Sequence, residues 1–310
     1  MKTEFYVSTS SALKKFLQRD RVIRAMTKDG HFRVAAVNLT NTARTAQERH
    51  ELGPLAAVFL GRLMAGATLL SSFLKGEERI ILEAMGKGPL KRVYAEAMEV
   101  GEIRGFVEEP EAFLDFSDPA VTLGDALGVG LFRVTKVLYN QFEPTVGVVE
   151  LIKGDISTDL AYYLTQSEQI PSAVILDARV DDDGNIESCG GLIVQAMPGT
   201  PEQEIVTIQE NLRNVSPVTD LFKVGYTPEE VLKVIIPTET EEINHARVDF
   251  FCRCSIDRFK SVLRTLGVDE INAMKEMGQN ELVCRYCNEK YTIPDEELDG
   301  MIEELRARSN

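Results

Sequence analysis

The chain has 310 residues, of which 44% are hydrophobic and 27% are charged. These values are near those of soluble globular proteins, so they exclude a disordered or fibrous chain. Acidic residues outnumber basic ones by 49 to 34, which gives a formal net charge of -15. Since nonspecific nucleic-acid affinity comes from clustered Lys and Arg, we expect no nucleic-acid partner.

The N-terminal segment lacks the apolar run of a secretory signal, so we expect a cytoplasmic protein. The most apolar segment, Pro54 to Lys75, is nearly long enough to span a membrane, but it contains Arg62. A charge at the centre of a spanning helix costs about 2.5 to 3.5 kcal/mol. We therefore predict a buried core helix from Pro54 to Leu74, ended near Gly76, and no membrane association.

Short apolar runs joined by Gly-containing turns predict an antiparallel meander from Glu78 to Val107. Two more strands are predicted from Gly130 and Thr145. A helix follows, for which Asp155 or Ser157 is the expected cap.

Two further apolar runs, at 172–180 and 186–197, flank the turn DDDGN at Asp181 to Asn185, which predicts a hairpin. Residues 1–197 are thus expected to form one α+β core with a mostly antiparallel sheet, one face of which the helix from Pro54 covers. Cys189, in the last of these strands, is expected to be a small buried residue, with an extra reactive thiol as the alternative.

Residues 198–249 have a different composition from the core. Two amphipathic helical stretches, 202–215 and 227–236, are interrupted by Pro217 and Gly225 and are followed by the acidic run TETEEIN. Short helices take much of their stability from packing on a neighbour. We predict a metastable helical linker that leans on the core.

Residues 250–310 are predicted to form a small separate domain. It contains a helix at 256–267, a second short helix from Asp269, a strand at KYTI and a last helix from about Pro294 to Arg306. A unit of this size buries little apolar area and commonly needs a metal or a disulfide.

Four of the five cysteines lie in this domain, as the pairs FCRCS and VCRYCNEKY. Clustered thiols in a reducing compartment more often bind metal or sense redox state than form permanent disulfides. Four thiolates suit one structural zinc ion. We predict that the zinc ligands are Cys252, Cys254, Cys284 and Cys287.

The same pairs can also act as redox sensors. Cysteines this close can form disulfides where the backbone permits, and a strained disulfide is easily reduced. Arg253 and Arg285 lie between the members of the pairs, where positive charge favours thiolate, although both can equally be surface arginines without a role. Loss of zinc would unfold the domain, because zinc supplies much of the folding free energy of such units.

Both cysteine pairs, the core strings ERHELGPLAAVFLGRLMAG, GKGPLKRVYAEAMEVGEIRGFV and CGGLIVQAMPGT, and the linker string YTPEEVL resemble the bacterial 33 kDa redox-regulated heat-shock chaperone family over nearly the whole chain. The resemblance implies a reduced, inactive form with one zinc per chain. It also implies oxidation to the disulfides Cys252–Cys254 and Cys284–Cys287, zinc release, unfolding of the linker and C-terminal domain, homodimerisation, and ATP-independent binding of unfolding client proteins. The first twenty or so residues fit the family pattern least well.

We expect clients to bind the sheet face beneath the linker and the amphipathic linker helices, because unfolding would expose those apolar faces. The alternative is a structural zinc ribbon that binds nucleic acid or a protein partner without redox switching. No catalytic residue or other cofactor site is predicted: His31, His50 and His245 are widely spaced, and the Gly-rich stretches lack the nucleotide-binding patterns. With four thiolates at hand, His245 is not needed as a ligand.

Overall fold

The computed structural model describes residues 19–236 and 238–309, without the side chains of residues 213, 308 and 309. The poorly matching N-terminal segment falls almost entirely outside these residues. Contacts divide the chain into two compact units, Met1–Phe250 and Phe251–Asn310. The first unit therefore contains both the predicted core and the predicted linker.

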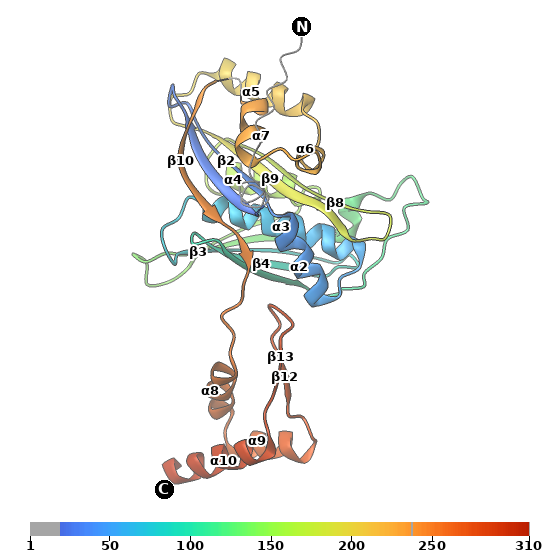
Figure 1. Ribbon diagram of the computed structural model, residues 1–310, viewed down its shortest axis with the longest axis vertical. Coiled ribbons are helices and arrows are strands. Elements are labelled where there is room, and N and C mark those ends of the chain that lie inside the picture. Colours follow the sequence, from blue (N-terminus) through green and yellow to red (C-terminus); the bar gives the residue numbers. More distant parts are fainter. Residues whose placement is uncertain (1–18, 237, 310) are drawn as a thin grey trace, which may run out of the picture. The chain divides into compact units, whose positions relative to one another are not determined.

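The long apolar helix lies at the centre of the first unit, between two sheets (Figure 1). This helix, α3 (Pro54–Ser71), contacts β3, β4 and β5 of one sheet and β2, β8 and β9 of the other. Of its 18 residues, 83% are buried within the protein. A helix that packs on both sides must be apolar all round, so the predicted core helix is confirmed.

One sheet has six strands in the order β11-β5-β4-β3-β6-β7. Neighbouring strands are antiparallel except for β11 and β5, and the predicted meander forms β3 to β5. The strand bounds are β3 (Arg79–Gly86), β4 (Arg92–Met98), β5 (Glu102–Val107), β6 (Gly130–Val137), β7 (Thr145–Glu150) and β11 (Asp249–Phe250).

The other sheet, which we call sheet A, is antiparallel and has the order β10-β1-β2-β9-β8. Its strands are β1 (Arg21–Thr27), β2 (Phe32–Asn38), β8 (Ser172–Val180), β9 (Ile186–Ala196) and β10 (Thr240–Arg247). The predicted hairpin is β8–β9, and Gly184 in its turn has a φ of 83°, which glycine adopts readily. The α+β class is confirmed, but the division into two sheets and the strands β1 and β2 were not predicted.

The acidic run of the predicted linker is not helical. It forms most of β10, which pairs with β1 along the free edge of sheet A. Most of its side chains are exposed, so backbone hydrogen bonds rather than apolar burial hold it. A polar, acidic sequence gives little strand signal, because the pairing partner lies more than 200 residues away.

Three linker helices cover the face of sheet A opposite α3 (Figure 1). They are α5 (Glu202–Asn214), α6 (Val218–Lys223) and α7 (Pro228–Ile235). In α7 the Thr227 hydroxyl accepts a hydrogen bond from the Glu230 amide and so caps the helix.

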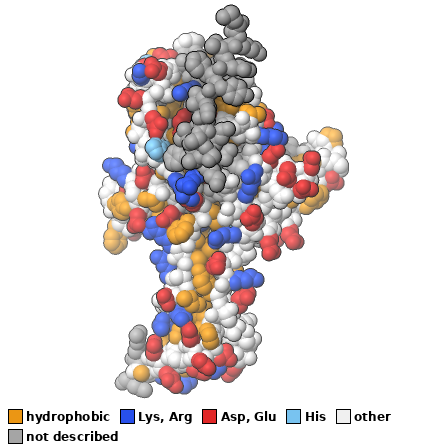
Figure 2. Space-filling model, in the orientation of Figure 1, with side chains coloured by type: hydrophobic (Ala, Val, Ile, Leu, Met, Phe, Trp, Pro, Cys, Tyr) orange, Lys and Arg blue, Asp and Glu red, His pale blue; other side chains and the backbone are white. Residues whose placement is uncertain are grey.

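Within the described part of the first unit, the remaining helices are α2 (Thr40–His50), α4 (Ser157–Gln166) and the 3-10 helix η1 (Leu123–Ala126). The expected cap of α4 is only partly right. Ile156 holds the N-cap position, while the Asp155 carboxylate accepts a hydrogen bond from the Thr158 amide at 2.7 Å. On the face shown in Figure 2, acidic and basic side chains are interspersed.

The second unit is held by a small apolar core. Its elements are α8 (Ile256–Leu266), α9 (Val268–Glu276), β12 (Glu281–Val283), β13 (Lys290–Thr292) and α10 (Asp295–Ser309). Six buried apolar side chains form the core: Leu263, Ile271, Ile293, Leu298, Met301 and Ile302. The predicted helices and the KYTI strand are confirmed, and β12 is the unpredicted partner of that strand.

Candidate metal centre

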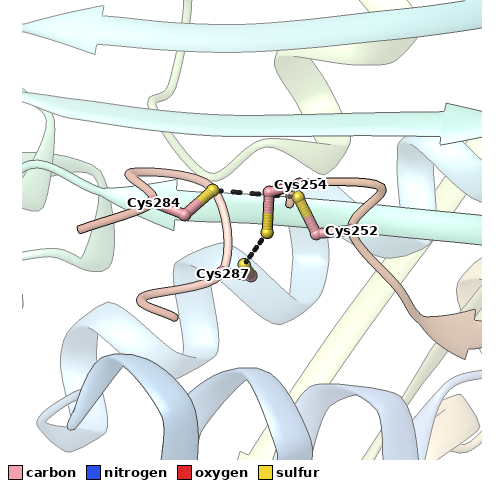
Figure 3. Close-up of side chains that lie close together, drawn as sticks. All are labelled: Cys252, Cys254, Cys284 and Cys287. Atoms are coloured by element: carbon pink, nitrogen blue, oxygen red, sulfur yellow. Dashed lines mark hydrogen bonds between the residues drawn. The ribbon is translucent and has the colours of Figure 1, made fainter. Parts of the chain in front are cut away.

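The four clustered cysteines come from two loops of the second unit (Figure 3). Cys252 and Cys254 precede α8, whose N-cap Ser255 accepts a hydrogen bond from the Arg258 amide. Cys284 and Cys287 follow β12, in the turn that leads to β13. The two loops are thus positioned by a helix start and by a short hairpin.

The turn between β12 and β13 orients the side chains of Cys284 and Cys287. The Cys284 carbonyl accepts hydrogen bonds from the amides of Cys287, at 3.3 Å, and Asn288, at 2.8 Å. Asn288 adopts a left-handed conformation with a φ of 56°, which asparagine tolerates better than most residues. Such a tight C-x-x-C turn places both sulfur atoms on the same side of the chain.

The sulfur positions fit one tetrahedral zinc ion. The Sγ atoms of Cys252 and Cys284 are 3.8 Å apart, those of Cys254 and Cys287 are 3.4 Å apart, and all four lie within 4.8 Å of one another. A tetrahedron with Zn–S bonds near 2.3 Å has sulfur–sulfur edges of about 3.8 Å. The predicted ligand set therefore converges without any other side chain.

The electrostatics of the site also call for a cation. Cys284 and Cys287 are buried, and burial, as the largest cause, raises the pKa of both thiols because it disfavours the charged thiolate. Four thiolates in one place need a positive ion to balance them. When bound, zinc would supply that charge and link the two loops.

One contact at the site was not predicted. The Tyr291 hydroxyl, on β13, lies 3.2 Å from the Cys254 sulfur and donates a hydrogen bond to the Cys254 carbonyl at 3.3 Å. Its ring also packs against Phe259 of α8, with ring centroids 5.3 Å apart. Tyr291 thus ties the first cysteine loop to the hairpin that carries the second.

Cys189 and the three histidines considered from the sequence lie in the first unit. Cys189 is fully buried against Gly61 of α3, and burial raises its pKa, as expected of an unreactive packing residue. His50 ends α2 and packs edge-on against Phe250. His245, on β10, contacts Glu242 with its Nδ1 atom at 2.8 Å.

Comparison with known proteins gives one consistent result. The family model described as Hsp33 protein matches residues 20–294. The 33 kDa chaperonins of Desulforamulus reducens and Bacillus subtilis are each 36% identical, over 94% and 91% of this chain and 99% and 98% of theirs. The crystal structure of the 33 kDa chaperonin from Thermotoga maritima superposes with a TM-score of 0.85 at 32% identity, covering 92% of this chain and 98% of that one.

Proposed function

Because the chain belongs to the Hsp33 family, we propose that it is a redox-regulated, ATP-independent holding chaperone of the cytoplasm that binds unfolding proteins. Cys252, Cys254, Cys284 and Cys287 act both as ligands of one zinc ion and as oxidant sensors. Oxidation releases zinc, unfolds the second unit and loosens the linker, and the oxidised protein works as a homodimer. The observation that carries the proposal is a large apolar surface of sheet A that, among the described residues, the linker helices cover.

This covered surface is one continuous cluster. Strand residues contribute Ile23, Ala25, Phe32, Val34, Ala36, Leu192 and Val194, and the linker contributes Ile208, Val218, Phe222, Val231, Leu232, Ile235 and Ile236. All of them are buried while the linker is in place. Detachment of the linker would expose both halves of the cluster, and a newly exposed apolar patch of this kind binds other apolar surfaces.

The linker helices are held unequally. In α5 only Ile208 is buried among the described side chains, and grooves of about 160 and 540 Å³ run beside Ile205. By contrast, α7 buries four apolar side chains, and its Glu229 pairs with Arg21 at 2.7 Å. Sparse packing favours local opening, so α5 should detach first.

Two buried residues anchor the chain between the linker and the second unit. Val248 and Phe250 are buried, and the Val248 amide donates a hydrogen bond to the Asp20 carbonyl at 3.0 Å. The weakly buried β10 lies immediately before them. Unfolding of the second unit would leave Phe250 as the end of the folded chain, with β10, held mainly by its pairing with β1, directly before this anchor.

The proposed disulfides, Cys252–Cys254 and Cys284–Cys287, have a specific thermodynamic consequence. Each forms when two thiolates and two protons react with one peroxide, which accepts two electrons and leaves as two waters, while Zn²⁺ departs unchanged. These bonds close loops of only three or four residues and leave the two cysteine loops unconnected. The unit then loses the zinc contribution of about 10 kcal/mol or more and gains no long-range link.

Sulfur contacts of 3.8 and 3.4 Å join the opposite pairs, Cys252–Cys284 and Cys254–Cys287. Such bonds would close loops of roughly 33 residues and retain about 3.7 kcal/mol of stabilisation by the loop-entropy relation. They would oppose unfolding of the unit. Disulfide mapping by mass spectrometry after peroxide treatment therefore tests the switch directly, and cross-loop bonds in the active form would contradict it.

The main experiment measures zinc content and suppression of client aggregation on the same samples. Reduced protein should hold one zinc per chain and be inactive, and protein oxidised by peroxide at elevated temperature should have lost zinc and be active. Zinc retention with no gain of activity would contradict the switch and favour a structural zinc unit. Mixing with DNA at low salt then tests the nucleic-acid alternative.

A further inference from the structure

A second group of metal-ligand side chains lies in the first unit, far along the chain from the cysteines. Asp29 and His31 lie in the turn between β1 and β2, and Glu204 lies in the first turn of α5. Their ligand atoms are all within 4.8 Å of one another. Since 173 residues separate His31 from Glu204, no sequence spacing could reveal this group.

The group has the geometry of an open three-ligand site. The His31 Nδ1 atom is 2.6 Å from the Glu204 Oε2 atom and 3.9 Å from the Asp29 Oδ1 atom. Ligands bound to zinc at about 2.0 to 2.2 Å lie roughly 3.3 Å apart, so shifts of well under 1 Å at each ligand would admit the ion. The three side chains are 32%, 33% and 40% exposed, which leaves an open position for water.

The surroundings hold two of the ligands in place. The Asp29 Oδ1 atom accepts hydrogen bonds from the Thr27 hydroxyl at 2.6 Å and from the His31 amide at 2.9 Å. Outer hydrogen bonds of this kind orient ligands in metal sites. With neutral imidazole, the group carries two negative charges, which match a divalent ion.

We propose that Asp29, His31 and Glu204 bind a second divalent transition metal ion, Zn²⁺ for preference, and that this ion fastens the start of the linker to the core. Imidazole with carboxylates suits zinc. The linker already meets the hairpin at this corner, where the His31 carbonyl accepts hydrogen bonds from the Met197 amide, at 2.8 Å, and the Thr200 hydroxyl, at 2.7 Å. A bound ion would strengthen the attachment of α5, the most sparsely packed linker helix.

The regulatory half of this proposal rests on the proposed function, because it treats linker opening as the activating step. Metal present at the site would delay opening. At a free Zn²⁺ concentration ten times the Kd, opening of α5 would be suppressed about tenfold.

The test uses the full-length reduced protein with its cysteine site saturated with zinc, titrated with further Zn²⁺ by calorimetry. Wild type should bind one additional ion, and H31A and E204Q should weaken that binding at least about tenfold. The matched control is H245A, which removes an exposed histidine that contacts a single carboxylate, Glu242. It should bind like wild type.

A second readout is the rate of protease cleavage within α5, measured with and without the additional Zn²⁺ and without any client. The ion should slow cleavage in wild type and H245A and leave H31A unaffected. No additional ion in wild type, or full binding by H31A, would overturn the site and leave a plain ion pair. Binding without protection would overturn its linker role. Neither measurement depends on chaperone activity, so failure of the proposed function would be seen separately.

Discussion

Replacement of Ile235 by alanine should loosen the linker without oxidation. Ile235 is the last residue of α7 and is 1% exposed in the cluster between the linker and sheet A. Truncating a buried isoleucine to alanine costs about 2 to 5 kcal/mol. At about 3 kcal/mol, the opening equilibrium of α7 rises by roughly 150-fold, since each 1.36 kcal/mol is a factor of ten.

Hydrogen exchange of the α7 amides measures that opening, and suppression of aggregation measures its effect. In reduced, zinc-bound I235A, the α7 amides should exchange about a hundredfold faster, and holding activity should appear before oxidation. V234A is the matched control, because Val234 is on the same helix but 52% exposed. It should change stability by no more than about 0.5 kcal/mol.

Two results would refute this reasoning in different ways. Unchanged exchange in I235A would mean that apolar packing of α7 does not hold the linker. Faster exchange with zinc retained but no holding activity would mean that the surface beneath α7 is not where clients bind.

Three further outcomes are expected. C287S should lose zinc and the folding transition of the second unit, since metal binding supplies about 10 kcal/mol or more of its folding free energy. The first unit should melt as before. Zinc analysis and calorimetry would measure the two effects. Burial acts to raise the pKa of Glu96, but hydrogen bonds from Arg104 and Arg79 outweigh it and hold the pKa below its usual range. The stabilisation of the folded protein by ionised Glu96 is therefore present above pH 4.5 and is lost as the pH falls through the folded pKa. E96Q should cost about 2 kcal/mol of unfolding free energy at pH 7, and it should flatten the acid side of a profile of urea-unfolding free energy against pH. An unchanged profile would contradict this. G190A would place a Cβ atom 2.5 Å from the Phe222 ring and 2.3 Å from the Val37 carbonyl oxygen. The substitution should therefore displace α6 and make the linker sensitive to protease in the reduced state. Protease resistance equal to that of wild type would contradict this packing.

The cysteine site was predictable because its chemistry is local. Two close pairs of thiols within about sixty residues need only a helix start and a tight turn to converge, and both are short-range features. The bridging contact of Tyr291 was not predictable, because a single tyrosine on a short strand carries no pattern that marks its partner.

Two helices of the core, α3 and α4, and most of its strands also followed from local pattern, whereas α2 was not predicted. Apolar runs and the DDDGN turn were sufficient for β3 to β9, and the apolar composition of α3 was sufficient to predict its burial. By contrast, β10 is acidic and mostly exposed, and it is a strand only because the edge of β1 offers it backbone hydrogen bonds.

Residue identity and short-range spacing were enough to indicate the family, the cluster of four cysteines and an amphipathic linker, because each depends on side chains close together in the chain. Long-range packing settled the rest. It divided the strands into two sheets around α3, placed the linker's apolar side chains on sheet A, and brought Glu204 to His31. Contacts between residues more than a hundred positions apart leave no periodic trace in the sequence, since they arise only when the whole unit buries its apolar surface.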